Sequence, residues 1–240
     1  MQTDTYLTRG GITVSRTVED IPVAGAIEPL VDALDNYRGA LLASSYEYPG
    51  RYTRWDMGFV RPPLEVVARG CEFWINALNE RGEVLVAAIV QGLQSEPDLL
   101  CHSERSEESV LAERMLHYVQ HDKGSLPATH RGAQQSCIEV TASTRDRVQG
   151  RIIRPEERFT EEERTRQPST FTLLRALLEL FGSDADSSLG LYGAFGYDLA
   201  FQFDTICQRL GRGADQRDLV LYLPDEIVLV DHQADRAIRR

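Results

Sequence analysis

The middle of the sequence contains a run of short β-prone segments separated by turn residues, and this pattern strongly limits the possible folds. The segments span residues 55–60, 64–69, 72–78 and 84–90, and they are separated by Pro62-Pro63, by Gly70 and by residues 79–82. Strands joined by such short connections pair antiparallel, because parallel strands need a crossover of about a dozen residues. The run therefore predicts an antiparallel meander, with residues 79–82 as a hairpin turn.

Other segments add strands and two helices to this meander. Residues 11–16 predict an edge strand, and residues 137–142, 189–198, 219–223 and 227–231 predict further strands, with a bulge or a switch of sheet at Pro224. Apolar residues at helical spacing predict helices over 24–37 and 170–181, the second ending at a left-handed Gly182. Beyond residue 231 no element is predicted. The expected fold class is α+β: sandwich-like antiparallel sheet layers, two or three packed helices and one inserted loop or helix.

Composition excludes several classes of protein. The chain has 26 basic and 37 acidic residues among 240, a net charge of −11, which argues against a nucleic-acid-binding surface. It has neither a long apolar run nor an amino-terminal signal pattern, so we expect a cytoplasmic protein without a membrane partner. The four cysteines have no paired spacing, and we assign no disulfide.

The segment from Gly39 to Pro63 carries the densest chemistry. A small apolar strand with Leu41 and Leu42 leads into hydroxyls, both charge signs and several rings, namely Ser44, Ser45, Tyr46, Glu47, Tyr48, Arg51, Tyr52, Arg54, Trp55 and Asp56. Rings left in water would forfeit roughly 1.5–3 kcal/mol each. The segment is either a corner between strands with its rings in the core, or a wall of a small-ligand pocket.

Residues 100–136 differ from the rest of the chain. Cys101, His102, His117 and His121 could be read as a zinc site, but no second close cysteine pair completes a known structural motif. A short amphipathic helix starting at residues 106–108 would also fit. The string CHSERSEES…MLHYVQHDK resembles the translated product of a palindromic interspersed DNA repeat of bacterial genomes, inserted in frame. We interpret the segment as an insertion into a surface loop, where added length costs little.

Three separated segments resemble the amino-terminal region of anthranilate synthase component I, and most closely its bacterial form fused to a glutaminase. They are LLASSYEYPGRYTRWDMGFVRPPLEV (41–66), LGLYGAFGYDLAFQFD (189–204) and RDLVLYLPDEIVLVDH (217–232). Residues 73–86 and 154–181 look similar too. This family converts chorismate and ammonia, delivered from glutamine by a glutaminase domain or subunit, to anthranilate and pyruvate in the first step of tryptophan synthesis.

The resemblance assigns residues 1–240 to a regulatory domain that helps to bind the inhibitor L-tryptophan. The effector-binding pattern falls on Leu41, Leu42, Ala43 and Ser44, and Ala43 departs from the acid that is common there. Arg51, or alternatively Arg54, would be a second basic residue of the pocket. A ring such as Tyr46 or Trp55 could cover an indole.

The same resemblance places the catalytic residues elsewhere. The chorismate-binding domain and its Mg²⁺ are expected outside this chain, which itself has no predicted catalytic residue, metal ligand or cofactor. We therefore expect a fragment of the enzyme that is inactive alone. Two alternatives stay open: a remnant of a disrupted gene, which the neighbouring DNA would reveal, and a metal-binding module that uses the inserted histidines.

Overall fold

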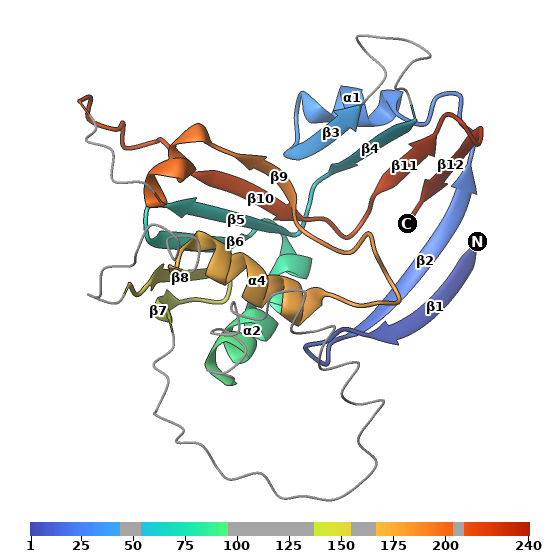
Figure 1. Ribbon diagram of the computed structural model, residues 1–240. Coiled ribbons are helices and arrows are strands. Elements are labelled where there is room, and N and C mark those ends of the chain that lie inside the picture. Colours follow the sequence, from blue (N-terminus) through green and yellow to red (C-terminus); the bar gives the residue numbers. More distant parts are fainter. Residues whose placement is uncertain (44–53, 96–136, 155–166, 204–208) are drawn as a thin grey trace, which may run out of the picture.

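The computed structural model describes residues 1–43, 54–95, 137–154, 167–203 and 209–240. This part of the chain has an α+β fold, as predicted, built from two antiparallel sheets of six strands each and a few helices (Figure 1). The predicted insertion at residues 100–136 lies outside the described residues, and so does most of the charged stretch at 154–166.

The first sheet joins strands from both ends of the chain. Its order is β1 (Gln2–Leu7), β2 (Thr13–Ile21), β12 (Arg236–Arg239), β11 (Val228–Asp231), β4 (Trp55–Val60) and β3 (Gly39–Ala43). Helix α1 (Glu28–Leu34) covers one face, where Leu30 packs with Val228, Val230 and Ala237 in a small core. In the described part of the chain, no helix covers the opposite face of this sheet (Figure 1).

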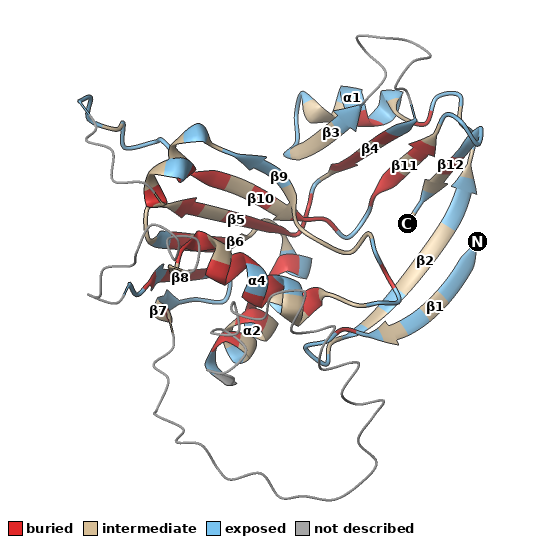
Figure 2. Ribbon diagram, viewed as in Figure 1, coloured by how far each residue is buried: buried red, intermediate tan, exposed pale blue. Residues whose placement is uncertain are grey.

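The second sheet holds the main core. Its order is β7 (Ile138–Ser143), β8 (Arg147–Ile152), β6 (Glu72–Ala77), β5 (Leu64–Arg69), β10 (Leu219–Leu223) and β9 (Tyr192–Phe195). Helices α2 (Glu80–Ser95) and α4 (Thr170–Phe181) pack on one face, and a 3₁₀ helix, η2 (Tyr197–Gln202), follows β9. Alternate strand residues such as Phe73 and Ile75 are fully buried against Ile89, Leu173 and Leu177. Figure 2 shows buried residues concentrated here, while the first sheet is mostly half-buried or exposed.

One bent pair of strands connects the two sheets. Strand β4 pairs with β11 in the first sheet, and their continuations β5 and β10 pair in the second. The bends fall at residues 61–63 and 224–227, where Pro62, Pro63 and Pro224 supply no N–H group to a sheet ladder. The predicted switch of sheet at Pro224 is therefore confirmed, and it coincides with a second switch at the proline pair.

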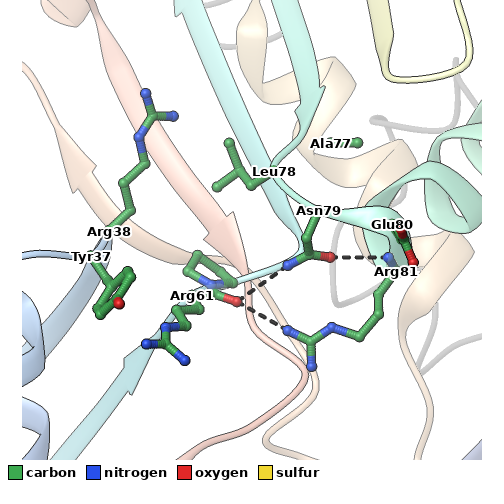
Figure 3. A pocket seen from close by; sticks show the side chains of 9 residues that line it. Tyr37, Arg38, Arg61, Ala77, Leu78, Asn79, Glu80 and Arg81 are labelled. Atoms are coloured by element: carbon green, nitrogen blue, oxygen red, sulfur yellow. Dashed lines mark hydrogen bonds between the residues drawn. The ribbon is translucent and has the colours of Figure 1, made fainter.

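The start of α2 fastens both bends. Arg81 Nη1 lies 2.7 Å from the Asp225 carboxylate, and Arg81 Nη2 donates to the Arg61 carbonyl oxygen at 3.2 Å. Figure 3 shows Asn79 and Arg81 converging on that carbonyl. Arg61 has a positive φ of 53°, an unusual conformation for a non-glycine residue, and its guanidinium lies 3.7 Å from the centre of the Tyr37 ring. The bend at Arg61 is thus held by the start of α2 and by Tyr37.

The prediction of a strand at residues 84–90 was wrong, and so was the hairpin at 79–82. Asn79 Oδ1 accepts hydrogen bonds from the N–H groups of Arg81 and Gly82, as an N-cap residue does, and α2 follows. The buried positions Gly82, Val86, Ile89 and Leu93 are spaced by three and four residues, whereas Val84 is 72% exposed. The β-branched residues suggested a strand, but the helical stripe decided the structure, because only this stripe fits against the sheet.

Four further expectations need correction. The predicted edge strand at 11–16 belongs to β2, which lies inside the sheet because the unpredicted β1 pairs with it. Residues 236–239, for which no element was predicted, form β12 between β2 and β11. Gly182 ends α4 in an extended conformation with φ −65°, not a left-handed one, because its carbonyl accepts the Arg9 N–H. Of the strand expected at 189–198, only residues 192–195 are β-structure.

Two glycines of α2 give a test of this packing. A Cβ at Gly82 would lie 2.1 Å from the Pro63 carbonyl oxygen, which already accepts the Leu78 N–H. We expect Gly82→Ala to destabilise the protein by about 1–3 kcal/mol in urea unfolding, although alanine favours helices.

Gly92→Ala is the matched control in the same helix. There the new methyl group would meet the movable end of the Leu180 side chain, at 2.9 Å. We expect its free energy of unfolding to stay within about 1 kcal/mol of the wild type. Equal stability of the two variants would contradict the close approach at Gly82.

Candidate functional site

The residues predicted to contact an effector fall at the end of β3, the outermost described strand of the first sheet. Leu41, Leu42 and Ala43 are the last three residues of that strand. Ser44 and Arg51 lie outside the described residues, and so does Tyr46. The described part of the site therefore consists of the end of β3 and the strands beside it.

The two leucines point to opposite faces of the sheet. Leu41 pairs with Gly58 of β4, and a Cβ at Gly58 would lie 3.2 Å from Leu41 Cδ1 and 2.9 Å from Leu30 Cδ1 of α1. Leu41 therefore faces α1, and Ala43 shares that face because successive strand residues alternate. Leu42 faces the other way and is 47% exposed. Leu41 and Leu42 consequently cannot line one wall together.

A buried carboxylate lies beside Ala43. Ala43 is exposed and pairs directly with Asp56 of β4, so the two side chains share a face. Asp56 is only 6% exposed, and its Oδ2 lies 2.7 Å from His232 Nε2. His232 follows β11, and the backbone N–H of His232 donates to the Arg54 carbonyl oxygen. The sequence analysis named Asp56 only as one residue of the polar segment and assigned no role to His232; the β3–β4 register is what links Asp56 to Ala43.

The opposite face at the same end of the sheet carries an aromatic ring. Trp55 is 45% exposed and shares this face with Leu42, and the Arg54 guanidinium lies 4.9 Å from the centre of its ring. Arg54 also lies 3.6 Å from the Asp231 carboxylate. Of the predicted pocket residues, Trp55 and Arg54 are thus brought together, on the face away from Leu41 and Ala43.

A cavity of about 350 Å³ lies between the two sheets, large enough for a small molecule. Its walls include Ile12, Phe181, Leu189 and Ile227, and one end carries the buried Asp186. The Asp186 carboxylate is fully hydrogen-bonded at that end. Its Oδ1 accepts from the N–H groups of Ser188 and Leu189 and from the Arg240 guanidinium. Its Oδ2 accepts from the Tyr6 hydroxyl at 2.8 Å. Because these groups already satisfy the carboxylate, the cluster ties three parts of the chain together and presents no unused charge to a ligand.

The Asp186 cluster shifts the titration of its members. Burial by itself raises the pKa of Asp186, but the bonds from Ser188, Tyr6 and Arg240 outweigh it and hold the pKa below its usual range. Burial, with the hydrogen bond donated to Asp186, raises the pKa of Tyr6 to about 12. The ionised carboxylate is therefore the form that the fold requires.

A second buried carboxylate serves the same purpose in the main core. Asp218 is fully buried and accepts hydrogen bonds from the Gly70 N–H at 2.6 Å, from Gln202 Nε2 at 3.2 Å and from Arg212. Gln202 Oε1 in turn accepts from the Thr170 N–H at the start of α4. Burial by itself raises the pKa of Asp218. The hydrogen bonds from these partners lower the pKa by more, so that it lies below its usual range. This cluster fixes α4 and η2 on the second sheet.

Other kinds of site receive little support from the described residues. Within those ranges no group of three or more His, Cys, Asp or Glu side chains could hold a metal ion, while Cys101, His102, His117 and His121 lie outside them. Cys71 and Cys137, the two described cysteines, are thiols. No described helix is long and apolar enough to cross a membrane.

Comparison with known proteins gives one informative match. The chain is 41% identical over 226 residues to an anthranilate synthase of Azospirillum brasilense. The matched region covers 94% of this chain but 25% of that relative. No family model matches the chain. The chain is therefore similar to one part of this anthranilate synthase, and it spans about a quarter of the length of the curated relative it matches.

The Asp186 cluster predicts a pH-dependent stability. A carboxylate with a lowered folded-state pKa stabilises the fold above its unfolded value of about 3.9, and this stability is lost as the pH falls through the folded value. We expect Asp186→Asn to lower the free energy of unfolding at pH 7 by up to about 3–5 kcal/mol, because Arg240 loses its buried partner. Unfolding at pH 7 and pH 3 should differ less in this variant than in the wild type.

Asp20→Asn provides the control for this experiment. Asp20 forms an exposed ion pair with Arg236, 2.8 Å long, on the first sheet. We expect it to change stability by less than about 1 kcal/mol at either pH. An Asp186→Asn variant with the pH dependence of the wild type would show that the Asp186 carboxylate does not act as described.

Proposed function

We propose that this chain is the amino-terminal, tryptophan-sensing portion of an anthranilate synthase, the enzyme that forms anthranilate and pyruvate from chorismate with ammonia or glutamine. The observation that carries this proposal is the 41% identity to the Azospirillum brasilense anthranilate synthase over 94% of the chain. The relative is about four times longer than the matched region, so we assign the synthase chemistry to parts of the enzyme outside this chain.

The end of β3 is the proposed place of effector binding. Ser44 follows directly on Ala43, and a serine hydroxyl can both donate to a carboxylate and accept from an ammonium group. Trp55 offers a half-exposed ring to an indole, and Arg54 beside it offers a positive charge. Arg51 would add a second positive charge. These groups suit an aromatic amino acid with its two opposite charges.

Tryptophan would inhibit the enzyme by shifting a population of conformations. A ligand changes an equilibrium only by its difference in affinity for the two states, so tryptophan must bind better when this chain and the chorismate-binding domain adopt an arrangement that is poor at catalysis. Leu42 and Trp55, each about half exposed on the face away from α1, would contact such a neighbour. The expected partners are therefore the chorismate-binding domain and a glutaminase domain or subunit.

The catalytic groups and the Mg²⁺ of the reaction belong, in this proposal, to the chorismate-binding domain. The chain would act in the cytoplasm, where a soluble biosynthetic enzyme meets its substrates. No residue of this chain is assigned a catalytic role.

The first test is an activity assay. We expect the purified 240-residue chain to form no anthranilate from chorismate, Mg²⁺ and high ammonia, measured by anthranilate fluorescence. We expect activity when the part of the relative that this chain does not cover is added. Fluorescence from the chain alone would overturn the assignment of catalysis to another domain.

The second test is calorimetric titration with L-tryptophan, with and without the added remainder of the relative. We expect weak binding to the chain alone and tighter binding to the pair, because the chain forms only part of the pocket. Ser44→Ala should weaken binding by about tenfold or more, the usual effect of losing a hydrogen bond to a charged group.

Ser143→Ala is the matched control, since Ser143 is an exposed residue at the end of β7 in the other sheet. It should leave the affinity unchanged. If tryptophan binds neither the chain nor the pair, the chain is not a tryptophan sensor, and the interpretation as a remnant of a disrupted gene gains support.

A further inference from the structure

One stretch of β2 has a neighbouring strand on one edge only. Strand β1 pairs with residues 13–18 of β2, whereas β12 pairs with residues 19–21 alone, so within the described ranges no strand lies beside the second edge of residues 13–17. We propose that this edge binds an extended polypeptide segment from the rest of the synthase, which adds a strand in line with β12. The inference rests on the proposed function, because that function supplies the partner.

The hydrogen-bond pattern shows which backbone groups face the unpaired edge. The N–H of Thr8 donates to the Ile12 carbonyl oxygen, so this opposite pair is a hydrogen-bonded one. Hydrogen-bonded and non-hydrogen-bonded pairs alternate along an antiparallel ladder, so every second residue of β2 from Val14 onward is bonded to β1. The N–H and C=O groups of the residues between them point to the other edge; these residues are Thr13, Ser15 and Thr17.

The pairing of β12 agrees with this alternation. Residues 19 and 21 continue the series that points away from β1, and they lie opposite residues 239 and 237 of β12. The next residue, Arg240, exchanges two N–H···O bonds with Ile227 on the β11 side. A strand in line with β12 would therefore meet the unpaired groups of β2 in turn and in the same register.

The same edge lines the cavity between the two sheets. Residues 12–17 form one wall of this space of about 350 Å³, and the other walls carry the apolar side chains of Leu85, Phe181, Leu189 and Ile227. Three successive N–H and C=O pairs need a regular row of donors and acceptors as their partner, and an extended backbone provides such a row. A polypeptide segment can thus satisfy the strand edge and cover the apolar walls together.

Strand alternation gives the side-chain chemistry of the occupant. Ile12 packs on the main core, and Val14 shares its face of β2. Thr13 and Ser15 are exposed on the opposite face. Because residues opposite each other on neighbouring strands share a face, the added segment alternates polar with apolar residues, and an apolar residue lies opposite Val14.

Hydrogen exchange on the complex tests the partner. We expect the N–H groups of Thr13, Ser15 and Thr17 to exchange at least about tenfold more slowly when the rest of the relative is bound to the full chain. Exchange at Val14 and Arg16, which β1 already protects, should change less. If the rest of the relative binds without protecting the three N–H groups, the inference is overturned and the proposed function stands. If it does not bind, the proposed function fails, and the named partner fails with it.

A synthetic strand tests the edge itself. The probe is the capped pentapeptide Ac-Thr-Val-Thr-Val-Thr-NH2, whose binding to the full chain is measured by calorimetric titration. At about ten times its Kd, the same three N–H groups should exchange about tenfold more slowly. A peptide N-methylated at the central threonine lacks the N–H that would face Ser15 and should bind at least about tenfold more weakly. A peptide that does not bind, or that binds equally well when methylated, would contradict the proposed edge.

Two proline variants separate this edge from the outer edge of β1. Ser15 and Thr5 lie directly opposite each other in a pair that is not hydrogen-bonded, so neither N–H is used between β1 and β2. Ser15→Pro removes the donor beside the cavity and should abolish peptide binding, whereas Thr5→Pro should keep the Kd within about twofold of the wild type. Ser15→Ala retains the N–H and should also bind normally. Binding lost in Thr5→Pro but kept in Ser15→Pro would place the peptide on the outer edge and overturn the inference.

Discussion

The bent pair of strands that passes from one sheet to the other is the constraint on which the rest of the structure depends. Because β4–β5 and β10–β11 change sheets at the same level, the two sheets cannot be assembled independently. Prolines at both bends release the ladder hydrogen bonds where the strands turn, and Arg81 joins the bends from the start of α2. The end of β3 owes its position to this pair, since β3 is held in the sheet by β4.

Buried carboxylates connect distant parts of this chain. Asp186 and Asp218 are each surrounded by several donors, including an arginine, and they fasten segments that are distant in sequence. Asp56 is buried to a similar degree, and its carboxylate lies 2.7 Å from the His232 side chain, which follows β11. Burial alone therefore does not identify a binding group.

Sequence patterns predicted the elements whose period was unambiguous. The helix at α4 has Leu174, Leu177 and Phe181 on one buried face, and the β-prone runs predicted at 64–69, 72–78 and 219–223 form β5, β6 and β10. Residues 84–90 misled the prediction, because valine and isoleucine favour strands while their helical stripe is visible only over the full length of α2. Strands β1 and β12 lacked a strong pattern of their own, since much of their surface is exposed, and pairing with β2 and β11 defines them.

By itself the sequence determined the α+β class and the antiparallel pairing of neighbouring strands, because these follow from local periodicity and from short connections. The dense polar segment and the resemblance to a known family directed attention to the end of β3 as the place to look for a ligand. Only the tertiary structure decided that Leu41 and Leu42 face opposite ways, that Asp56 stands beside Ala43, and that His232, 176 residues further along the chain, holds its carboxylate. The physical reason is that strand register and sheet order depend on how distant segments pack together, and no local pattern of residues encodes that packing.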